Sequence, residues 1–233
     1  MTCSVLFAVF VVSLVFPVLN AGVHESGQSP VMAKRITIVA MGDSTTAGTP
    51  GWKSRVEAPP SGAGDETSQY AYWLMQAHPG WEILNQGVNG ERSDEIRARF
   101  ERDVIRLAPA AVVIIAGVND VYQGRSARHV IEQLASMYDL AKQKGIPVVA
   151  GTIIPYNTAT GDQNRRMREI NDWIGKTSAT GSGVSFVDTR AAAAAPGNSD
   201  RLFESPDGLH PSPAGYRRMA DAIGPVLEKV LDK

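Results

Sequence analysis

Residues Ile36 to Gly48 read I-T-I-V-A-M-G-D-S-T-T-A-G, and this stretch predicts the fold of the chain. Its first six residues are apolar or β-branched, which is typical of a strand covered on both faces in a parallel sheet. The strand is expected to end at Gly42. Ser44 follows at the carboxyl end of the strand, where open α/β sheets hold their ligands, so it is the candidate nucleophile. The same residues also fit a plain turn in which Asp43 or Ser44 only caps the next helix.

Strands alternate with helices along the rest of the chain. Four more strands are predicted at Trp81 to Asn85, Ala111 to Ala116, Val148 to Ile154 and Val184 to Asp188. Helices are predicted over Tyr70 to His78, from Ser93, from Ser126, over Asp162 to Ile174, and from Ser212 onward with a kink at Gly224-Pro225. This alternation predicts an α/β fold, a three-layer α/β/α sandwich with a parallel sheet of about five strands. The loops holding Ser44, Gly90 and Asn119 then share one edge of the sheet.

The first 34 residues are expected to be separate from this fold. Thr2 to Ala21 carry no charge, and the apolar run from Val5 to Val18 has the length of a signal-peptide core. Residues 1–21 are therefore predicted to be a signal peptide cleaved near Ala21, 22–34 a polar leader and 35–233 the folded domain. The expected location is periplasmic or secreted, with no stable membrane insertion after cleavage. An uncleaved anchor is the alternative, because the start lacks the usual basic residue.

Composition excludes several classes of function. A net charge of −1 over 233 residues, without a lysine or arginine run, gives no field for binding nucleic acid. Cys3 is the only cysteine and precedes the apolar run, so a cleaved chain would have no disulfide, no catalytic thiolate and no cysteine-bound metal. No histidine pair has the spacing of metal ligands. We therefore expect neither a metal nor another cofactor.

A long segment from Gly48 to Gln69 is rich in glycine, proline and small polar residues, and is predicted to be a loop. Because it begins four residues after Ser44, we expect it to form a wall or a lid over the active site. A floppy surface insertion is the alternative. The segment from Ala191 to Asp207 is also expected to be mostly irregular.

One of the four histidines differs from the others in its setting. His210 lies in the sequence Asp207-Gly208-Leu209-His210-Pro211, where the acid three residues earlier can fold round the glycine and accept a hydrogen bond from the imidazole. A common Asp-Gly turn before proline is the alternative. The remaining histidines occupy positions more typical of surface or capping roles: His24, His78 and His129.

Four separated blocks of this sequence together resemble the SGNH hydrolases, or GDSL-type esterases. The blocks are Gly42 to Ser44, Asn85 to Gly90, Gly117 to Asp120 and Asp207 to His210. Thr45 departs from the family pattern, in which leucine is often found. The resemblance runs from about Ile36 to the last helix and implies the flavodoxin-like SGNH hydrolase fold.

The resemblance also implies roles for individual residues. Ser44 would attack the acyl carbon, His210 would act as general base and then acid, and Asp207 would orient His210. The oxyanion hole would consist of the backbone N–H groups of Ser44 and Gly90 and the side-chain amide of Asn119. Gly87 is the rival for the second-block position, but Gly90 matches better because a polar pair follows it before the helix cap.

These roles imply a serine esterase that hydrolyses carboxylic esters through an acyl-enzyme intermediate. Short acyl chains are expected, because the loops around the site offer few large apolar residues beyond Trp52 and Tyr122. A carbohydrate O-acetylesterase is the first alternative, favoured by export and by Tyr156 and Asn157 after the fourth strand. Thioesterase and lysophospholipase activities also occur in similar proteins. A non-catalytic binding module on the same fold is a further alternative. The partner is expected to be a small-molecule or carbohydrate ester, with no nucleic acid.

Overall fold

The structure is a computed structural model that describes residues 1, 35–180 and 183–232. Apart from Met1, the predicted signal peptide and polar leader therefore lie outside the described residues. The domain itself forms one compact unit, Lys34–Lys233.

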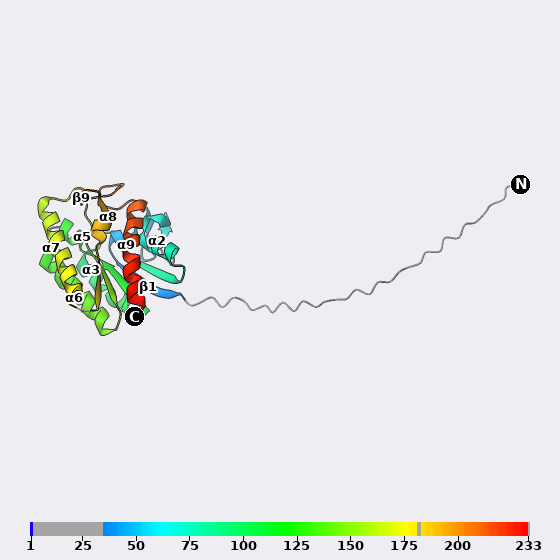
Figure 1. Cartoon of the computed structure of the whole chain (residues 1–233), viewed down its shortest axis with the longest axis horizontal. Coiled ribbons are helices and arrows are strands. Elements are labelled where there is room, and N and C mark those ends of the chain that lie inside the picture. Colours follow the sequence, from blue (N-terminus) through cyan, green and yellow to red (C-terminus); the bar gives the residue numbers. More distant parts are fainter. Residues whose placement is uncertain (2–34, 181–182, 233) are drawn as a thin grey trace. The chain divides into compact units, whose positions relative to one another are not determined.

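A five-stranded parallel sheet forms the centre of the domain, as predicted (Figure 1). Its strands, in spatial order, are β4 (Trp81–Gly87), β1 (Ile36–Gly42), β5 (Ala111–Ile115), β6 (Val148–Gly151) and β7 (Val184–Val187). Counted along the chain this order is 2-1-3-4-5, the flavodoxin-like arrangement, in which the strand order reverses beside the first strand. The crevice for ligands is therefore expected between the loops that follow β1 and β5.

Helices cover both faces of the sheet and complete the three layers. On one face, α2 (Tyr70–Ala77) and α9 (Pro213–Leu231) pack against Ile38 and Ala40 of β1. On the other, α3 (Ser93–Ala98), α6 (Ala127–Gln143) and α7 (Gly161–Ser178) pack against Val39 and Met41. All four of these β1 side chains are fully buried, which explains why the strand reads as a continuous apolar run rather than an alternating one.

The helix predicted from Ser93 is broken into three pieces. After α3 come α4 (Phe100–Asp103) and a 3-10 turn, η2 (Ile105–Leu107). The spacing of the apolar residues after Ser93 predicts a buried stripe of Ile96, Phe100, Val104 and Leu107. This is correct for the first three, which are fully buried, and wrong for Leu107, which is 39% exposed. A 3-10 turn has about three residues per turn instead of 3.6, so the end of the segment leaves the register of the buried stripe.

Strand β6 ends three residues earlier than predicted, although the apolar sequence continues. Beyond Gly151 the backbone of Ile153 forms hydrogen bonds with a side chain instead of with a neighbouring strand. The side-chain amide of Asn171, on α7, accepts from Ile153 N at 2.8 Å and donates to Ile153 O at 3.0 Å. Ile153 is therefore buried but lies outside the sheet, which corrects the predicted strand at this end.

Both segments expected to be irregular contain small antiparallel hairpins. The segment after Ser44 holds α1 (Ser44–Ala47), then β2 (Trp52–Lys53) paired with β3 (Ala63–Gly64), and η1 (Glu66–Ser68). The later segment holds α8 (Thr189–Ala193), followed by β8 (Ala194–Ala195) paired with β9 (Asn198–Leu202). The remaining short helix, α5 (Val118–Tyr122), follows β5.

Candidate active site

Ser44 lies at the carboxyl end of β1, as the first residue of α1. Asp43 caps this helix, because its Oδ1 accepts a hydrogen bond from Thr45 N at 2.9 Å. The capping alternative is thus correct for Asp43, and it coexists with the placement of Ser44 as a candidate nucleophile. Only 4% of Ser44 is exposed. The short capped helix holds the serine hydroxyl at the edge of the sheet where the ligand crevice is expected.

His210 lies between Ser44 and Asp207. Its Nε2 is 3.0 Å from Ser44 Oγ, and its Nδ1 is 2.7 Å from Asp207 Oδ2. Asp207 Oδ1 also accepts from the backbone N–H groups of Leu209 and His210, at 2.9 and 2.8 Å. The turn that makes these contacts possible passes through Gly208, whose φ of 76° favours glycine. The structure therefore brings Ser44, from the first block, together with Asp207 and His210, from the last block.

Electrostatics keep the Asp207 carboxyl ionised. Partial burial on its own would raise its pKa, but the hydrogen bonds from the His210 ring and from two backbone N–H groups outweigh burial and lower the pKa below its usual value of 3.8. An ionised carboxylate only accepts, so Nδ1 of His210 carries the hydrogen and Nε2 has a lone pair for the Ser44 hydroxyl. This arrangement can withdraw a proton from Ser44 and balance the imidazolium that results.

The turn that carries Asp207 and His210 is held by two neighbours that the sequence analysis did not assign to it. Ser205 Oγ accepts from Gly208 N at 2.8 Å and donates to the His210 carbonyl at 2.6 Å. Asn157, in the loop after β6, donates its backbone N–H to the Gly208 carbonyl at 2.7 Å. The loop after β6 therefore lies directly beside the histidine.

The two loops predicted to supply oxyanion donors lie together. Gly90 is exposed in the loop after β4, and Asn119 is in the first turn of α5. Asn119 Nδ2 donates to the carbonyl oxygen of Glu91 at 2.9 Å, which ties the two loops to each other. Gly87 has a different function, because a Cβ there would lie 2.1 Å from the backbone nitrogen of Ala47. It is a packing glycine beside α1, which favours Gly90 as the candidate donor.

A buried arginine supports the same loops and carries no signal in the sequence that we recognised. Arg99, at the break between α3 and α4, is only 8% exposed. Its Nη2 donates to the Gly42 carbonyl at 3.0 Å and its Nε donates to Glu91 at 2.6 Å. Asp103 accepts from Nη1 at 2.9 Å and completes the pairing of the charge. Arg99 thus connects the end of β1 to the loop that contains Gly90.

The long segment after Ser44 forms a wall beside this loop. The buried Ser54 donates from Oγ to the Gly87 carbonyl, and Glu57 accepts from the backbone N–H of Asn89 at 2.9 Å. Trp52 is buried, and with Arg55 it borders a groove of about 550 Å³ along the free edge of β4. These contacts agree with the predicted wall. A lid over Ser44 stays a prediction.

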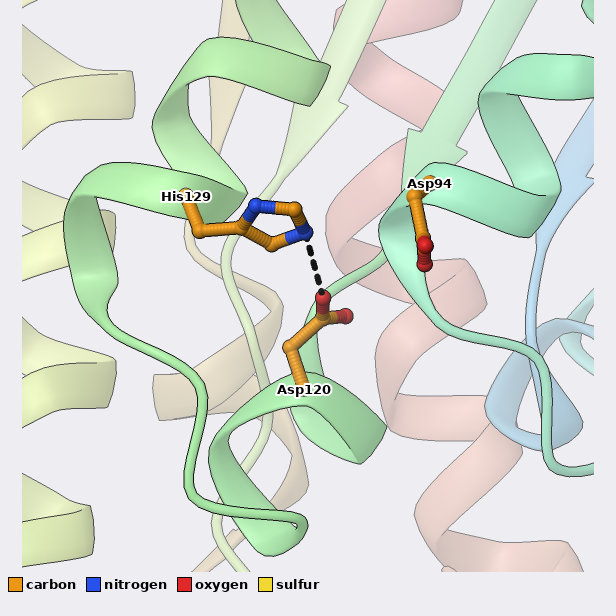
Figure 2. A group of neighbouring side chains, drawn as sticks. All are labelled: Asp94, Asp120 and His129. Carbon is orange, nitrogen blue, oxygen red and sulfur yellow. Dashed lines mark ion pairs between the residues drawn. The ribbon is translucent and has the colours of Figure 1, made fainter.

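Figure 2 shows a cluster of two acids and a histidine: Asp94, Asp120 and His129. The fully buried Asp120 accepts from both Ser93 N and Ser93 Oγ at 2.8 Å, and His129 points its Nε2 at Asp120 Oδ1 from 3.8 Å. Asp94 brings its carboxylate into the same space, with the three atoms within 4.8 Å of one another. The spacing of residues in the sequence does not predict this cluster, because its members come from three separate helices, α3, α5 and α6.

The polar contacts within this cluster fit a structural support better than a cation site. Burial raises the pKa of Asp120, although the hydrogen bonds from Ser93 oppose the change. Both Asp120 oxygens already accept hydrogen bonds from Ser93. Asp94 accepts a hydrogen bond from the positively charged Arg92 at 3.2 Å. A guanidinium at this distance disfavours a second cation. The cluster therefore anchors the start of α3, directly after Gly90.

Within residues 35–180 and 183–232 no helix is both long and apolar enough to cross a membrane.

Comparison with known proteins identifies relatives over most of the domain. Residues 40–218 match the model of the GDSL-like lipase/acylhydrolase family. An acetylxylan esterase of Geobacillus stearothermophilus is 30% identical over 173 residues, which are 66% of this chain and 77% of that protein. An uncharacterised lipoprotein of Bacillus subtilis (strain 168) is 30% identical over 131 residues, 53% of this chain and 51% of that protein.

Solved structures agree with these sequence matches. A GDSL-like lipase from Bacteroides thetaiotaomicron superposes with a TM-score of 0.68 at 25% identity, covering 84% of this chain and 89% of that one. A catalytic mutant of an acetylxylan esterase from Geobacillus stearothermophilus superposes with a TM-score of 0.63 at 24% identity, covering 84% and 94%. At that identity the second likeness shows the fold alone.

Proposed function

The chain belongs to the GDSL-like lipase/acylhydrolase family and is a carboxylic ester hydrolase, and on that premise we propose that it is a serine esterase with Ser44, His210 and Asp207 as its catalytic residues. One observation carries this proposal. The His210 ring lies within hydrogen-bond distance of both other residues, at 3.0 Å from Ser44 Oγ and 2.7 Å from Asp207. A serine that lacks such a base is a weak nucleophile, so this contact supports an active site over a plain turn.

The first half of the reaction follows from the direction of these hydrogen bonds. Ser44 Oγ attacks the acyl carbon while His210 Nε2 takes its proton, and the ionised Asp207 stabilises the imidazolium. His210 then gives that proton to the leaving alcohol, and the acyl group stays on Ser44 as an ester. In the second half a water molecule attacks the acyl carbon while His210 Nε2 accepts its proton. His210 then returns this proton to Ser44 Oγ as the bond between Oγ and the acyl carbon breaks, and the acid is released.

Three donors are proposed for the oxyanion that forms in each half. Ser44 is the first residue of α1, so its N–H has no acceptor within the helix. Gly90 offers a backbone N–H from an exposed loop. Asn119 offers the second N–H of its amide, since the first is donated to Glu91. Removing one donor of this kind typically costs about 3 kcal/mol of transition-state stabilisation.

Chemical labelling tests the nucleophile directly. A fluorophosphonate ester should add one phosphonyl group to the protein, on the peptide that contains Ser44. The Ser44→Ala variant should lose both the label and the hydrolysis of p-nitrophenyl acetate. Ser61→Ala is a matched control, because Ser61 is an exposed serine of the nearby wall, and it should keep both. A label that persists in Ser44→Ala would reject Ser44 as the nucleophile.

The proposed substrates are short-chain esters, with acetyl esters of carbohydrates as the leading class. The acetylxylan esterase that is 30% identical to this chain supports the acetyl and sugar parts of this proposal. The test is a series of p-nitrophenyl esters from acetate to laurate, run beside acetylated xylan and an acyl thioester. Values of kcat/KM that rise steadily toward laurate would favour a lysophospholipase-type activity instead. A preference for the thioester would favour a thioesterase.

Export of the mature enzyme is part of the proposal. The apolar, uncharged start of the sequence supports it, as does the similarity to a bacterial lipoprotein. The intact mass of the exported protein should equal that of a chain that begins at Gly22, after cleavage at Ala21. Exported protein that keeps Met1 would show an uncleaved anchor.

A further inference from the structure

Tyr122 is an exposed aromatic residue at the edge of the sheet where the active site lies. It is the last residue of α5 and is 57% exposed. Among the described residues, four other large apolar side chains are exposed: Met1, Ile36, Leu107 and Phe186. Ile36 is the first residue of β1, Leu107 ends the 3-10 turn before β5, and Phe186 lies on the edge strand β7. Tyr122 is thus the one member of this set that follows the carboxyl end of a strand in the described part of the chain.

Its position is fixed relative to both sides of the proposed site. On one side Tyr122 is three residues after Asn119 on the same short helix, and residues three apart share a helix face. On the other side its ring packs edge-on against Tyr156, with centroids 5.8 Å apart and planes at 63°. Tyr156 directly precedes Asn157, which bonds to Gly208 beside His210. The tyrosine pair therefore connects the oxyanion side of the site to the histidine side.

Tyr156 packs against Tyr122 and has a hydroxyl group without a hydrogen-bond partner among the described residues. The residue is 1% exposed, and its hydroxyl is buried with it. A buried phenol without a partner is costly, and such groups are usually paired with protein, water or ligand. The pair therefore combines an exposed aromatic ring with a buried hydroxyl that has no partner among the described residues. Apolar surface and a few polar groups are the features that ligand sites combine.

From this placement we propose that Tyr122 is the platform on which a sugar ring of the substrate packs while its acetyl ester reaches Ser44. The inference rests on the proposed function and deepens it. An acetyl group is too small to supply much binding energy, since it buries only one methyl group. Selectivity for one acetyl ester over another must then come from the alcohol part. The apolar C–H face of a pyranose complements the face of an aromatic ring, and the phenol oxygen can reach a ring hydroxyl.

Selectivity between a sugar ester and a plain ester tests the platform. The measured quantity is kcat/KM for acetylated xylobiose divided by kcat/KM for ethyl acetate, which has no ring. Tyr122→Ala should lower this ratio by about three- to tenfold, mainly through KM, because aromatic contacts of this kind are worth about 0.5–1.5 kcal/mol. Tyr122→Trp should restore it. Phe186→Ala is the matched control, since it removes the exposed aromatic on β7, and it should leave the ratio unchanged.

Binding without turnover gives a second readout. Ser44→Ala should bind acetylated xylobiose in calorimetry, and the double variant Ser44→Ala/Tyr122→Ala should bind it about three- to tenfold more weakly. If the wild-type enzyme hydrolyses acetylated xylobiose and Tyr122→Ala keeps the ratio, the platform is wrong and the proposed function stands. A gain in activity toward butyrate and hexanoate esters in Tyr122→Ala would place Tyr122 in the acyl pocket and overturn the platform. If the wild-type enzyme hydrolyses ethyl acetate and no sugar ester, both the carbohydrate assignment and the platform fail.

Discussion

The side chain of Asn119 donates a hydrogen bond from Nδ2 to the carbonyl oxygen of Glu91 over 2.9 Å. This contact joins the loop after β5 to the loop after β4, and it uses one of the two hydrogens of the amide. The remaining hydrogen is then held in a fixed direction, which is what a preorganised oxyanion donor requires. We therefore propose two functions for Asn119: it positions the Gly90 loop and supplies a donor to the oxyanion.

Replacing Asn119 should reduce catalysis while leaving the protein folded. Asn119→Ala is expected to lower kcat by about 10²- to 10³-fold, because a donor present only for the oxyanion acts on the transition state. KM should change little. Gln123→Ala is a suitable control, since Gln123 is an exposed amide that accepts from Arg92 at the far end of α5. Steady-state kinetics and circular dichroism on both variants check this, and a normal kcat in folded Asn119→Ala would remove Asn119 from the oxyanion hole.

Asp207 is predicted to orient His210. Asp207→Asn should keep the fold and lower kcat by roughly 10²- to 10⁴-fold, because an amide can stabilise the wrong tautomer of the imidazole and cannot balance its charge. Asp207 also accepts from two backbone N–H groups, and the amide oxygen of asparagine can keep those bonds. The measurement is kcat with the melting temperature. Near-normal kcat would leave Ser44 and His210 as a dyad, with His210 held by another group.

Asp120 is predicted to matter through Ser93 rather than through a metal ion (Figure 2). Asp120→Ala leaves the N–H and Oγ of Ser93 without their acceptor in a buried site, which should cost about 2–4 kcal/mol of unfolding free energy. It should also lower kcat, because α3 begins three residues after Gly90. Asp94→Ala removes the more exposed acid of the cluster and should cost less than about 1 kcal/mol. Urea titrations compare the two.

A double-variant cycle identifies the partner of Asp120. If Asp120 acts through Ser93, the effects of Asp120→Ala and Ser93→Ala on unfolding free energy should be far from additive. Additive effects would indicate a different partner, with His129 as the nearest candidate at 3.8 Å. A loss of stability in the wild-type protein on chelation would contradict the view that the cluster is a structural support without a cation.

The sequence predicted the features that depend on local patterning, and missed those that depend on long-range contacts. The apolar run of β1 and the Asp207-Gly208 turn are local features, so the sequence predicted that Ser44 and His210 would lie close together. The structure places Ser44 Oγ 3.0 Å from His210 Nε2, and their catalytic roles stay a proposal. Arg99 could not be predicted, because its buried charge is compensated by the Gly42 carbonyl and by Glu91, partners that only the folded chain brings near. The early end of β6 has the same cause, since an amide on α7 replaces the neighbouring strand.

Asp43 should make stability depend on pH in a direction opposite to that of most carboxylates. Burial raises the pKa of Asp43 from its ordinary value of 3.8 to about 7, and its Oδ2 has no hydrogen-bond partner among the described residues. The unfolded chain loses this proton near pH 4 while the folded chain keeps it to about pH 7. The unfolded state therefore binds fewer protons over that interval, and the contribution of Asp43 to stability falls as pH rises.

Asp43→Asn removes this titration while keeping an oxygen for Thr45 N. One pKa unit corresponds to about 1.4 kcal/mol, so the stability of Asp43→Asn relative to wild type should rise by up to about 4 kcal/mol between pH 4 and pH 8. Urea unfolding of both proteins across this range measures the difference. The matched control is Asp65→Asn, because Asp65 caps η1 in the same way but is exposed. The change with pH should be larger for Asp43→Asn than for Asp65→Asn, because of the two only Asp43 is buried. A constant difference for Asp43→Asn would mean that Asp43 is ionised in the folded protein beside Ser44.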